Sequence, residues 1–108
     1  MGYHLREIPK GVLGEWSKVE EELAEFEDAK EQGSKILMLV ELSDIWGALV
    51  AYTLKHNSEK DWYQKSDNAS KFVIDEARNL DTRIEEIIKF SRITERAFMS
   101  GERTSGTN

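Results

Sequence analysis

The apolar residues of the chain fall into helical repeats separated by short polar segments. The first repeat recurs every three or four residues and consists of Trp16, Val19, Leu23 and Phe26. This spacing predicts a helix from about Gly14 to Gln32. Gly33 suits the left-handed residue that ends a helix, and Ser34 suits the N-cap of the next one. Before the helix, a proline and a glycine predict an extended arm over residues 1–13.

The second stretch, residues 35–56, is apolar on nearly every face. Its segment from Ile36 to Leu54 is nineteen residues long and carries only two charges, Glu41 and Asp44. This composition predicts a central helix that is buried by neighbours on several sides. The segment is nearly long enough to cross a membrane. Two carboxylates near its centre and the lack of a second span favour a buried helix in a bundle instead.

The second half of the chain predicts two more helices. Polar residues 57–66 predict a loop, and a third, shorter helix is expected over about 68–78. A fourth begins at the capping-box pattern Thr82-Arg83-Ile84-Glu85 and is expected to reach about Ser100. We therefore expect an all-α, four-helix-type bundle formed by a single domain over residues 1–100. Residues 101–108 are polar and predict a disordered tail.

Two pairs of carboxylates occupy matching positions on the first two helices. Glu22 and Glu25 are three residues apart, and so are Glu41 and Asp44. Residues at this spacing share a helix face, so an antiparallel pair of helices can bring all four carboxylates together. Oxygen-only clusters suit hard cations such as Mg²⁺ or Mn²⁺. Without a cation, one of Glu41 and Asp44 should be protonated, because two buried carboxylates one turn apart repel each other.

The same residues permit simpler interpretations. Glutamates on a helix are usually solvated, and Glu41 and Asp44 could form buried salt bridges with a lysine or arginine from another helix. Glu21, Glu27 and Asp28 are expected to be solvated. The two histidines of the chain, His4 and His56, are expected to be incidental rather than metal ligands.

Composition narrows the function classes. The formal net charge of −6 argues against a broad basic surface for polymeric nucleic acid. A small phosphorylated ligand remains possible, because bound metal ions reverse the local charge. The chain has no cysteine, which excludes disulfides and thiolate zinc sites. The N-terminus lacks the apolar run of a signal peptide, so we expect a cytoplasmic protein, with no membrane partner. A chain of 108 residues buries a modest core, so assembly as a homodimer or homotetramer is expected.

A family resemblance follows from these motifs. Glu21-Glu22-Leu23-Ala24-Glu25 and Glu41-Leu42-Ser43-Asp44 resemble the EExxE and ExxD signature of the MazG-like, all-α nucleoside triphosphate pyrophosphohydrolases. Other segments resemble the short, single-domain members found in phages: Ile8-Pro9-Lys10-Gly11, Gly14-Glu15, Ser17-Lys18, Asp28-Ala29, Gln32, Lys35-Ile36, Gly47-Ala48, Lys89-Phe90-Ser91, Thr94, Arg96-Ala97-Phe98 and Gly101-Glu102-Arg103. The resemblance covers about residues 8–56 and 84–103 and leaves residues 57–80 without a counterpart.

The resemblance implies a reaction and a set of site residues. Family members cleave an NTP or dNTP between its α and β phosphates, giving a nucleoside monophosphate and pyrophosphate. The four carboxylates match the family's metal ligands, and Glu21 either activates water, supports a second metal or is solvated. Candidate phosphate-binding cations are Lys18, Lys89, Arg92, Arg96 and Arg103. Candidate contacts to the base are Ile8, Lys10, Gly11 and Trp16, although Trp16 also suits the core.

The substrate and two rival functions stay open at this point. We expect a dNTP, with dGTP or dCTP first, and the dGTP-directed MazZ-like branch of the family is one option. A related enzyme could act on a phosphoribosyl compound instead. A rival from another class is a non-catalytic acidic helical interaction module, in which Glu41 and Asp44 pair with basic residues and added Mg²⁺ has no effect.

Overall fold

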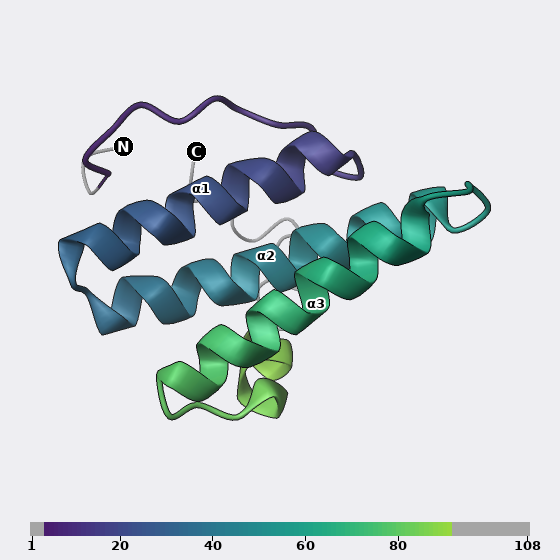
Figure 1. The fold of residues 1–108 in the computed structure, drawn as a ribbon. Helices are drawn as coiled ribbons and strands as arrows, with labels where there is room; N and C mark the ends of the chain where they lie inside the picture. The colour runs from purple at the N-terminus through teal and green to yellow at the C-terminus, as the bar shows by residue number, and fades with distance from the viewer. Residues whose placement is uncertain (1–3, 92–108) are drawn as a thin grey trace, which may run out of the picture.

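Three long helices and one shorter helix make up the fold (Figure 1). The computed structural model describes residues 4–91, and within these residues it contains no strand. The long helices are α1, Trp16–Gln32, α2, Lys35–His56, and α3, Trp62–Asn79. Residues 84–91 form the shorter one. The predicted all-α class is therefore confirmed, whereas the predicted dimer or tetramer stays a prediction.

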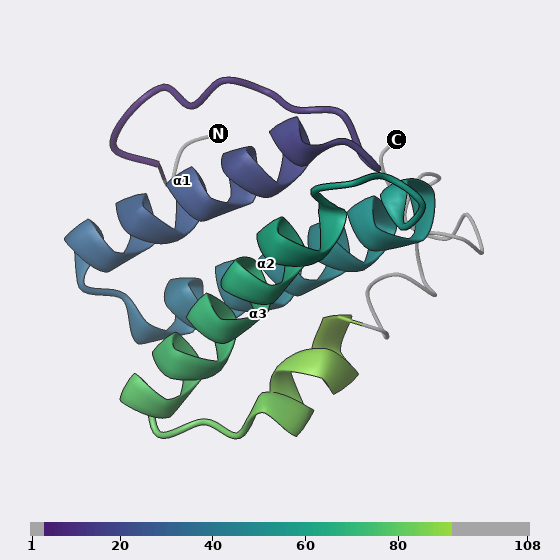
Figure 2. The ribbon, with the colours of Figure 1, turned by 45° about the vertical axis from the view of Figure 1, so that its right-hand side comes forward.

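The turn between α1 and α2 uses the residues that the sequence indicated. Gly33 adopts a left-handed backbone with φ of 70°, a conformation that glycine reaches without steric cost. The Ser34 hydroxyl accepts a hydrogen bond of 3.2 Å from the Leu37 N–H and so caps α2. The two helices run antiparallel, and α3 returns along another side of α2 (Figures 1 and 2). Because α1 and α3 both pack on α2, α2 is the central helix.

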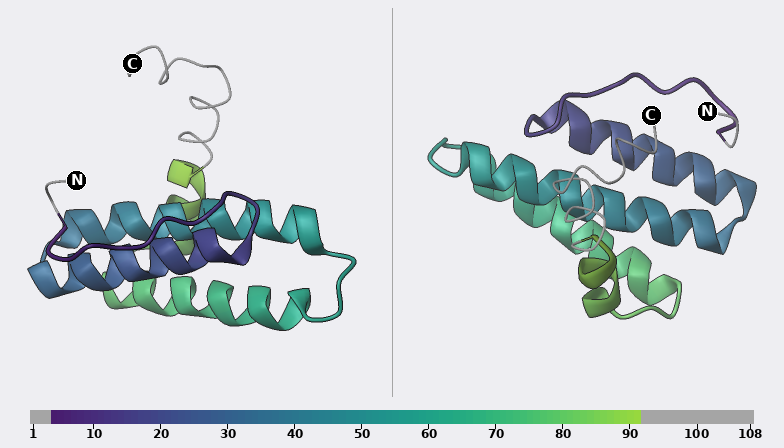
Figure 3. Two further views of the ribbon diagram at one scale, coloured as in Figure 1. Left: turned by 90° about the horizontal axis from the view of Figure 1, so that it is seen from above. Right: turned by 180° about the vertical axis from the view of Figure 1, so that it is seen from behind.

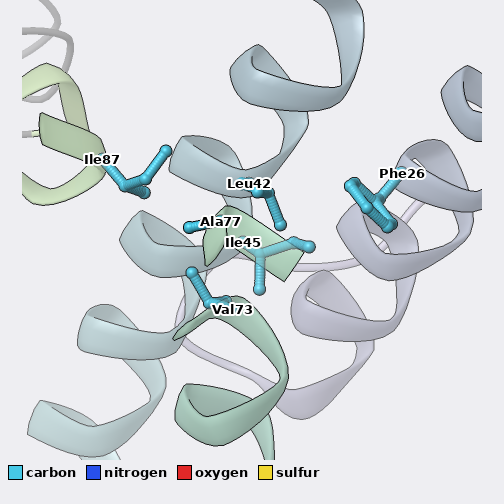
Figure 4. Packing of buried hydrophobic residues seen from close by; sticks show 6 residues of the cluster. All are labelled: Phe26, Leu42, Ile45, Val73, Ala77 and Ile87. Carbon is cyan, nitrogen blue, oxygen red and sulfur yellow. The ribbon is translucent and has the colours of Figure 1, made fainter. Parts of the chain in front are cut away.

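Apolar side chains from all four helices meet in the core (Figure 4). The main cluster consists of Phe26, Leu42, Ile45, Val73, Ala77 and Ile87, all at most 3% exposed. A second cluster joins α1 and α2 through Val19, Ala48 and Tyr52. Trp16 packs edge-on against Tyr52, with ring centroids 5.1 Å apart. The apolar stripe predicted for the first helix thus faces the core along its whole length.

The starts of three helices differ from the predictions. α1 begins at Trp16 rather than Gly14, because Gly14 has φ of 91°, which no helix accommodates. α3 begins at Trp62, six residues before the predicted start, because Trp62 packs against the second cluster. The predicted capping box is wrong: the last helix starts at residue 84, and the Thr82 hydroxyl donates to the Leu80 carbonyl instead. The predicted end near Ser100 and the tail 101–108 lie outside the described residues.

The exposure of α2 is uneven. By length and composition alone, α2 could cross a membrane, a test that the core helix of a soluble bundle also passes. Its middle is covered by α1 and α3, whereas Ile36 and Leu54 near its ends are 75% and 72% exposed. The prediction of burial on several sides therefore holds for the middle of α2 and is wrong at its ends.

An N-terminal arm, residues 4–13, lies along α1 (Figures 1 and 3). The Leu5 N–H donates to both oxygens of Asp28, at 3.0 and 2.9 Å, and the Gly11 N–H donates to Glu21 at 2.8 Å. The Gln32 amide donates a third hydrogen bond to Asp28, at 2.9 Å. The predicted solvation of Asp28 is wrong, because this side chain is fully buried beneath the arm. Burial alone would raise the pKa of Asp28, but these donors lower it and keep the carboxylate ionised.

Asp28→Asn is expected to loosen the arm. Asparagine keeps the shape but loses the charge and half of the acceptors, so the free energy of unfolding should fall by about 2 kcal/mol. Limited trypsin digestion, monitored by mass spectrometry, should then cut faster after Arg6 and Lys10, which both lie in the arm. The control is Glu27→Gln, because Glu27 neighbours Asp28 in sequence but is exposed. Equal cleavage rates in the two variants would show that Asp28 does not fasten the arm.

Candidate metal centre

The antiparallel pairing of α1 and α2 gathers the four predicted carboxylates. Glu22 and Glu25 lie one turn apart on α1, and Glu41 and Asp44 lie one turn apart on α2. One oxygen of each side chain lies within 4.8 Å of the corresponding oxygens of the other three. The predicted convergence is thus confirmed. The four residues are called the acidic quartet below.

Two members of the acidic quartet, Glu22 and Glu41, are buried and incompletely paired, whereas Glu25 and Asp44 are partly buried. Glu41 is 1% exposed and Glu22 is 6% exposed. Within the part of the chain that the structure describes, Glu22 Oε1 and Glu41 Oε1 have no hydrogen-bond partner. A buried carboxylate oxygen without a donor costs free energy unless a proton or a cation satisfies it. The quartet therefore has the chemical character of a site for a positively charged ligand.

The pKa values of the quartet show how strongly these charges oppose one another. Burial, followed by the nearby charges of Asp44 and Glu25, raises the pKa of Glu41 to about 9. Burial and the charge of Glu25 raise the pKa of Glu22 to about 7. Burial and the charge of Glu22 raise the pKa of Asp44 to about 6. At neutral pH the metal-free site thus retains a proton on Glu41, as its burial beside Asp44 predicts.

Among the lysines and arginines of residues 4–91, Lys18 contacts the quartet. Its ammonium lies 3.1 Å from Glu22 Oε2 and 3.1 Å from Glu21 Oε1. One lysine that is shared between two carboxylates cannot balance the charge of the whole quartet. Among residues 4–91, neither Glu41 nor Asp44 forms an ion pair with a lysine or arginine. The described residues therefore do not contain the salt bridges that the interaction-module hypothesis requires.

Glu21 lies beside the quartet but contacts different groups. The predicted solvation of Glu21 is wrong, because the side chain is 5% exposed. It accepts hydrogen bonds from the Gly11 N–H and Lys18, and Lys10 Nζ lies 3.9 Å from its second oxygen. Burial acts to raise its pKa, but the Gly11 N–H and Lys18 lower it below the usual value. A carboxylate with a lowered pKa is a weak base. These contacts favour a role for Glu21 in anchoring the arm over a role in activating water.

His4 is a neighbour of the quartet that the sequence analysis missed. Its Nε2 lies 3.8 Å from Glu25 Oε2, and its Nδ1 lies 3.2 Å from Asp28 Oδ2. The imidazole also belongs, with Glu25 and Glu41, to a set of potential ligand atoms within 4.8 Å of one another. The arm brings His4 to this place from 24 residues away. One sequence feature could have indicated a partner at this place: Asp28 follows Glu25 by one helical turn and therefore lies on the same face of α1.

The residues predicted to contact the nucleobase do not line a common pocket within residues 4–91. Ile8 is partly buried on the arm, Lys10 is exposed, and the Gly11 N–H is bonded to Glu21. Trp16 instead lines a cavity of about 390 Å³ between α1 and α3, to which the arm contributes no residue. Lys65 places its ammonium 5.3 Å from the Trp16 ring. Trp16 is thus partly a core residue, as the sequence analysis allowed.

The predicted phosphate-binding cations are only partly placed by the structure. Lys18 contacts the quartet, and Lys89 is exposed on the helix of residues 84–91. The helix reaches α2 at Gly47, where a β-carbon would lie 3.1 Å from Ser91 Oγ. Gly47 follows Asp44 by one turn, so the described chain ends near the quartet. Arg92, Arg96 and Arg103 lie outside the described residues, and their role stays a prediction.

Comparison with known proteins adds no relative. No protein-family model, curated protein or solved structure matches this chain. Two observations therefore bear on function: the motif resemblance of the sequence, and the geometry of the acidic quartet. The second is a physical property of this chain and does not depend on the first.

Proposed function

We propose that this chain is a metal-dependent nucleotide pyrophosphohydrolase. One observation carries the proposal: four carboxylates, two of them buried and two partly buried, converge on one point, and two of their oxygens have no donor among the described residues. Oxygen ligands of this kind suit Mg²⁺ or Mn²⁺, which Glu22, Glu25, Glu41 and Asp44 would hold. The motif resemblance supplies the reaction, which is cleavage of an NTP or dNTP to the monophosphate and pyrophosphate.

The chain and its cation have separate roles in this proposal. A bound divalent cation neutralises phosphate charge and lowers the pKa of water. Lys18 stabilises the charge of Glu22 and keeps it beside Glu25. Positive side chains then bind the departing pyrophosphate, whose charge grows as the bond breaks. The proposed residues are Lys89 and, beyond the described residues, Arg92, Arg96 and Arg103.

The proposed substrate class is a dNTP, with dGTP or dCTP first. This choice rests on the motif resemblance. A panel of all NTPs and dNTPs, with pyrophosphate release as the readout, tests it in one experiment. A phosphoribosyl pyrophosphate compound in the same panel tests the related enzyme class. If Mg²⁺ produces no turnover of any compound and leaves the melting temperature unchanged, the chain is an acidic interaction module instead.

The bond that is cleaved gives the decisive measurement. In ¹⁸O-labelled water, with Mg²⁺ and the best substrate of the panel, one label should enter the nucleoside monophosphate and none the pyrophosphate. This result follows from attack of water at the α phosphate. Mass spectrometry of both products provides the readout, and the same reaction with excess EDTA provides the control. Release of orthophosphate and a nucleoside diphosphate would mean attack at the γ phosphate, and the proposed reaction would be wrong.

A further inference from the structure

We propose that His4, Glu25 and Glu41 form a second metal position, which contains a nitrogen ligand and takes a borderline transition metal such as Zn²⁺ or Cu²⁺. This position shares two carboxylates with the acidic quartet but draws its third ligand from the arm. The inference rests on the metal-binding part of the proposed function. It does not depend on which reaction the site performs.

The geometry of the three side chains fits a metal ion. Their potential ligand atoms lie within 4.8 Å of one another, and His4 Nε2 is 3.8 Å from Glu25 Oε2. Ligand atoms around a tetrahedral zinc with bonds of about 2.05 Å lie roughly 3.4 Å apart. The His4–Glu25 pair is therefore close to the separation that binding requires. Glu41 is 1% exposed, and its Oε1 has no donor among residues 4–91.

Asp28 fixes the orientation of the imidazole. Both oxygens of Asp28 accept from the Leu5 N–H, and Oδ2 also accepts from Gln32, so His4 Nδ1 is assigned as the donor across its 3.2 Å contact with Oδ2. In the neutral ring, Nε2 is then the nitrogen with a lone pair, and Nε2 is the atom beside Glu25. Histidine ligands in metal proteins almost always donate the other ring N–H to a carboxylate, a backbone carbonyl or a water, and Asp28 is such a partner. The Leu5 N–H and Gln32 in turn hold Asp28 in place. A fixed, buried carboxylate therefore orients the imidazole.

The ligand types of the two positions predict different metal preferences. Carboxylates alone suit Mg²⁺ and Mn²⁺, whereas imidazole suits zinc, iron, copper and nickel. The chain contains no cysteine and two histidines, so a nitrogen ligand from a histidine can only be His4 or His56. His56 contacts Glu15 and Glu59. Since neither of these glutamates belongs to the quartet, His56 is a matched control for His4.

The test compares His4→Gln with His56→Gln in the full chain. Glutamine can still donate a hydrogen bond to Asp28 but offers no imidazole. Calorimetric titration with Zn²⁺ should show affinity at the tightest site reduced by about tenfold or more in His4→Gln and unchanged in His56→Gln. Mg²⁺ affinity should be the same in both variants and the wild type. Pulsed EPR of the wild type loaded with one equivalent of Cu²⁺, a paramagnetic ion that imidazole suits, should show ¹⁴N coupling, which His4→Gln loses and His56→Gln keeps.

The outcomes separate this inference from the proposed function. Unchanged Zn²⁺ affinity in His4→Gln, or an equal loss of Zn²⁺ and Mg²⁺ affinity, would overturn the inference, because His4 would then act only by holding the arm. Absence of ¹⁴N coupling in the wild type would also overturn it, and this measurement decides the matter if His4→Gln does not fold. If Zn²⁺ binding depends on His4 while Mg²⁺ does not bind at all, the inference stands and the proposed hydrolase fails.

Discussion

Glu41→Gln is expected to abolish metal-dependent pyrophosphate release and to raise the melting temperature of the metal-free protein. Glu41 is the least exposed member of the quartet, and one of its oxygens has no donor among the described residues. Glutamine has nearly the same shape, so the fold should persist. Losing one metal ligand removes several kcal/mol of transition-state stabilisation, which corresponds to a rate loss of about a thousandfold or more.

The melting temperature of the metal-free Glu41→Gln variant should rise, although its activity falls. Glutamine is neutral without a proton, so the folded variant avoids the free-energy cost of keeping Glu41 protonated at pH 8, which burial and the charges of Asp44 and Glu25 impose. A gain of about 1 kcal/mol at pH 8 would raise the melting temperature by about 4–8 °C in a domain of this size. Calorimetry in EDTA measures this change, and pyrophosphate release in Mg²⁺ measures the loss of activity.

The matched control is Glu20→Gln, which removes an exposed carboxylate from α1 and should change neither quantity. A Glu41→Gln protein that fails to fold would mean that Glu41 is a structural ion-pair partner. A folded Glu41→Gln protein with wild-type turnover would exclude Glu41 from the metal site.

The second large effect is a loss of stability of the metal-free protein as the pH rises from about 5 to 9. The folded-state pKa of Glu41 is about 9, above its usual value of 4.5. Glu22 and Asp44 shift in the same direction, to about 7 and about 6. A raised carboxyl pKa means that the folded state binds the proton more tightly than the unfolded state. The stabilisation from this tighter proton binding is complete below the pKa of the unfolded state. It is lost as the pH rises through the pKa of the folded state.

The expected loss across this window is on the order of a few kcal/mol, a large share of the 5–15 kcal/mol by which most domains are stable. Excess Mg²⁺ should reduce this loss of stability, because Mg²⁺ binds the carboxylates that have lost their protons. Its affinity therefore rises as the pH rises. The gain in melting temperature on adding Mg²⁺ should therefore grow from pH 5 to pH 9. A gain that stays constant with pH, or a metal-free protein that is most stable at pH 9, would contradict the raised pKa values.

Periodic features of the sequence were sufficient to predict much of the fold and the acidic quartet. The stripe from Trp16 to Phe26 and the apolar run of α2 each specify one helix and its buried side. The i, i+3 spacing of the carboxylates then places the quartet, because an antiparallel pair leaves few other arrangements. These are properties of single helices and of one short turn, and they are local.

The missed features depend on contacts between distant residues. The first turn of α3 lies in a segment that is polar apart from Trp62 and Tyr63, and Trp62 packs against the cluster of Val19, Ala48 and Tyr52. Asp28 shares a helix face with Glu25, but its full burial depends on the arm, whose Leu5 lies 23 residues earlier. His4 reaches Glu25 by the same route. No local pattern of charges or apolar residues encodes such a contact.

The fastening of the arm has a consequence for how this chain can diverge. Deleting the residues before Val12 would remove the Leu5 and Gly11 donors and leave Asp28 and Glu21 as anions with fewer partners in a newly opened groove. A shortened descendant would therefore need compensating changes on α1, with neutral or apolar side chains in place of both acids. The arm and the two acidic positions of α1 should therefore be retained or lost together. Chains that keep an acid at positions 21 and 28 should keep the arm, and chains without the arm should have other residues at both positions.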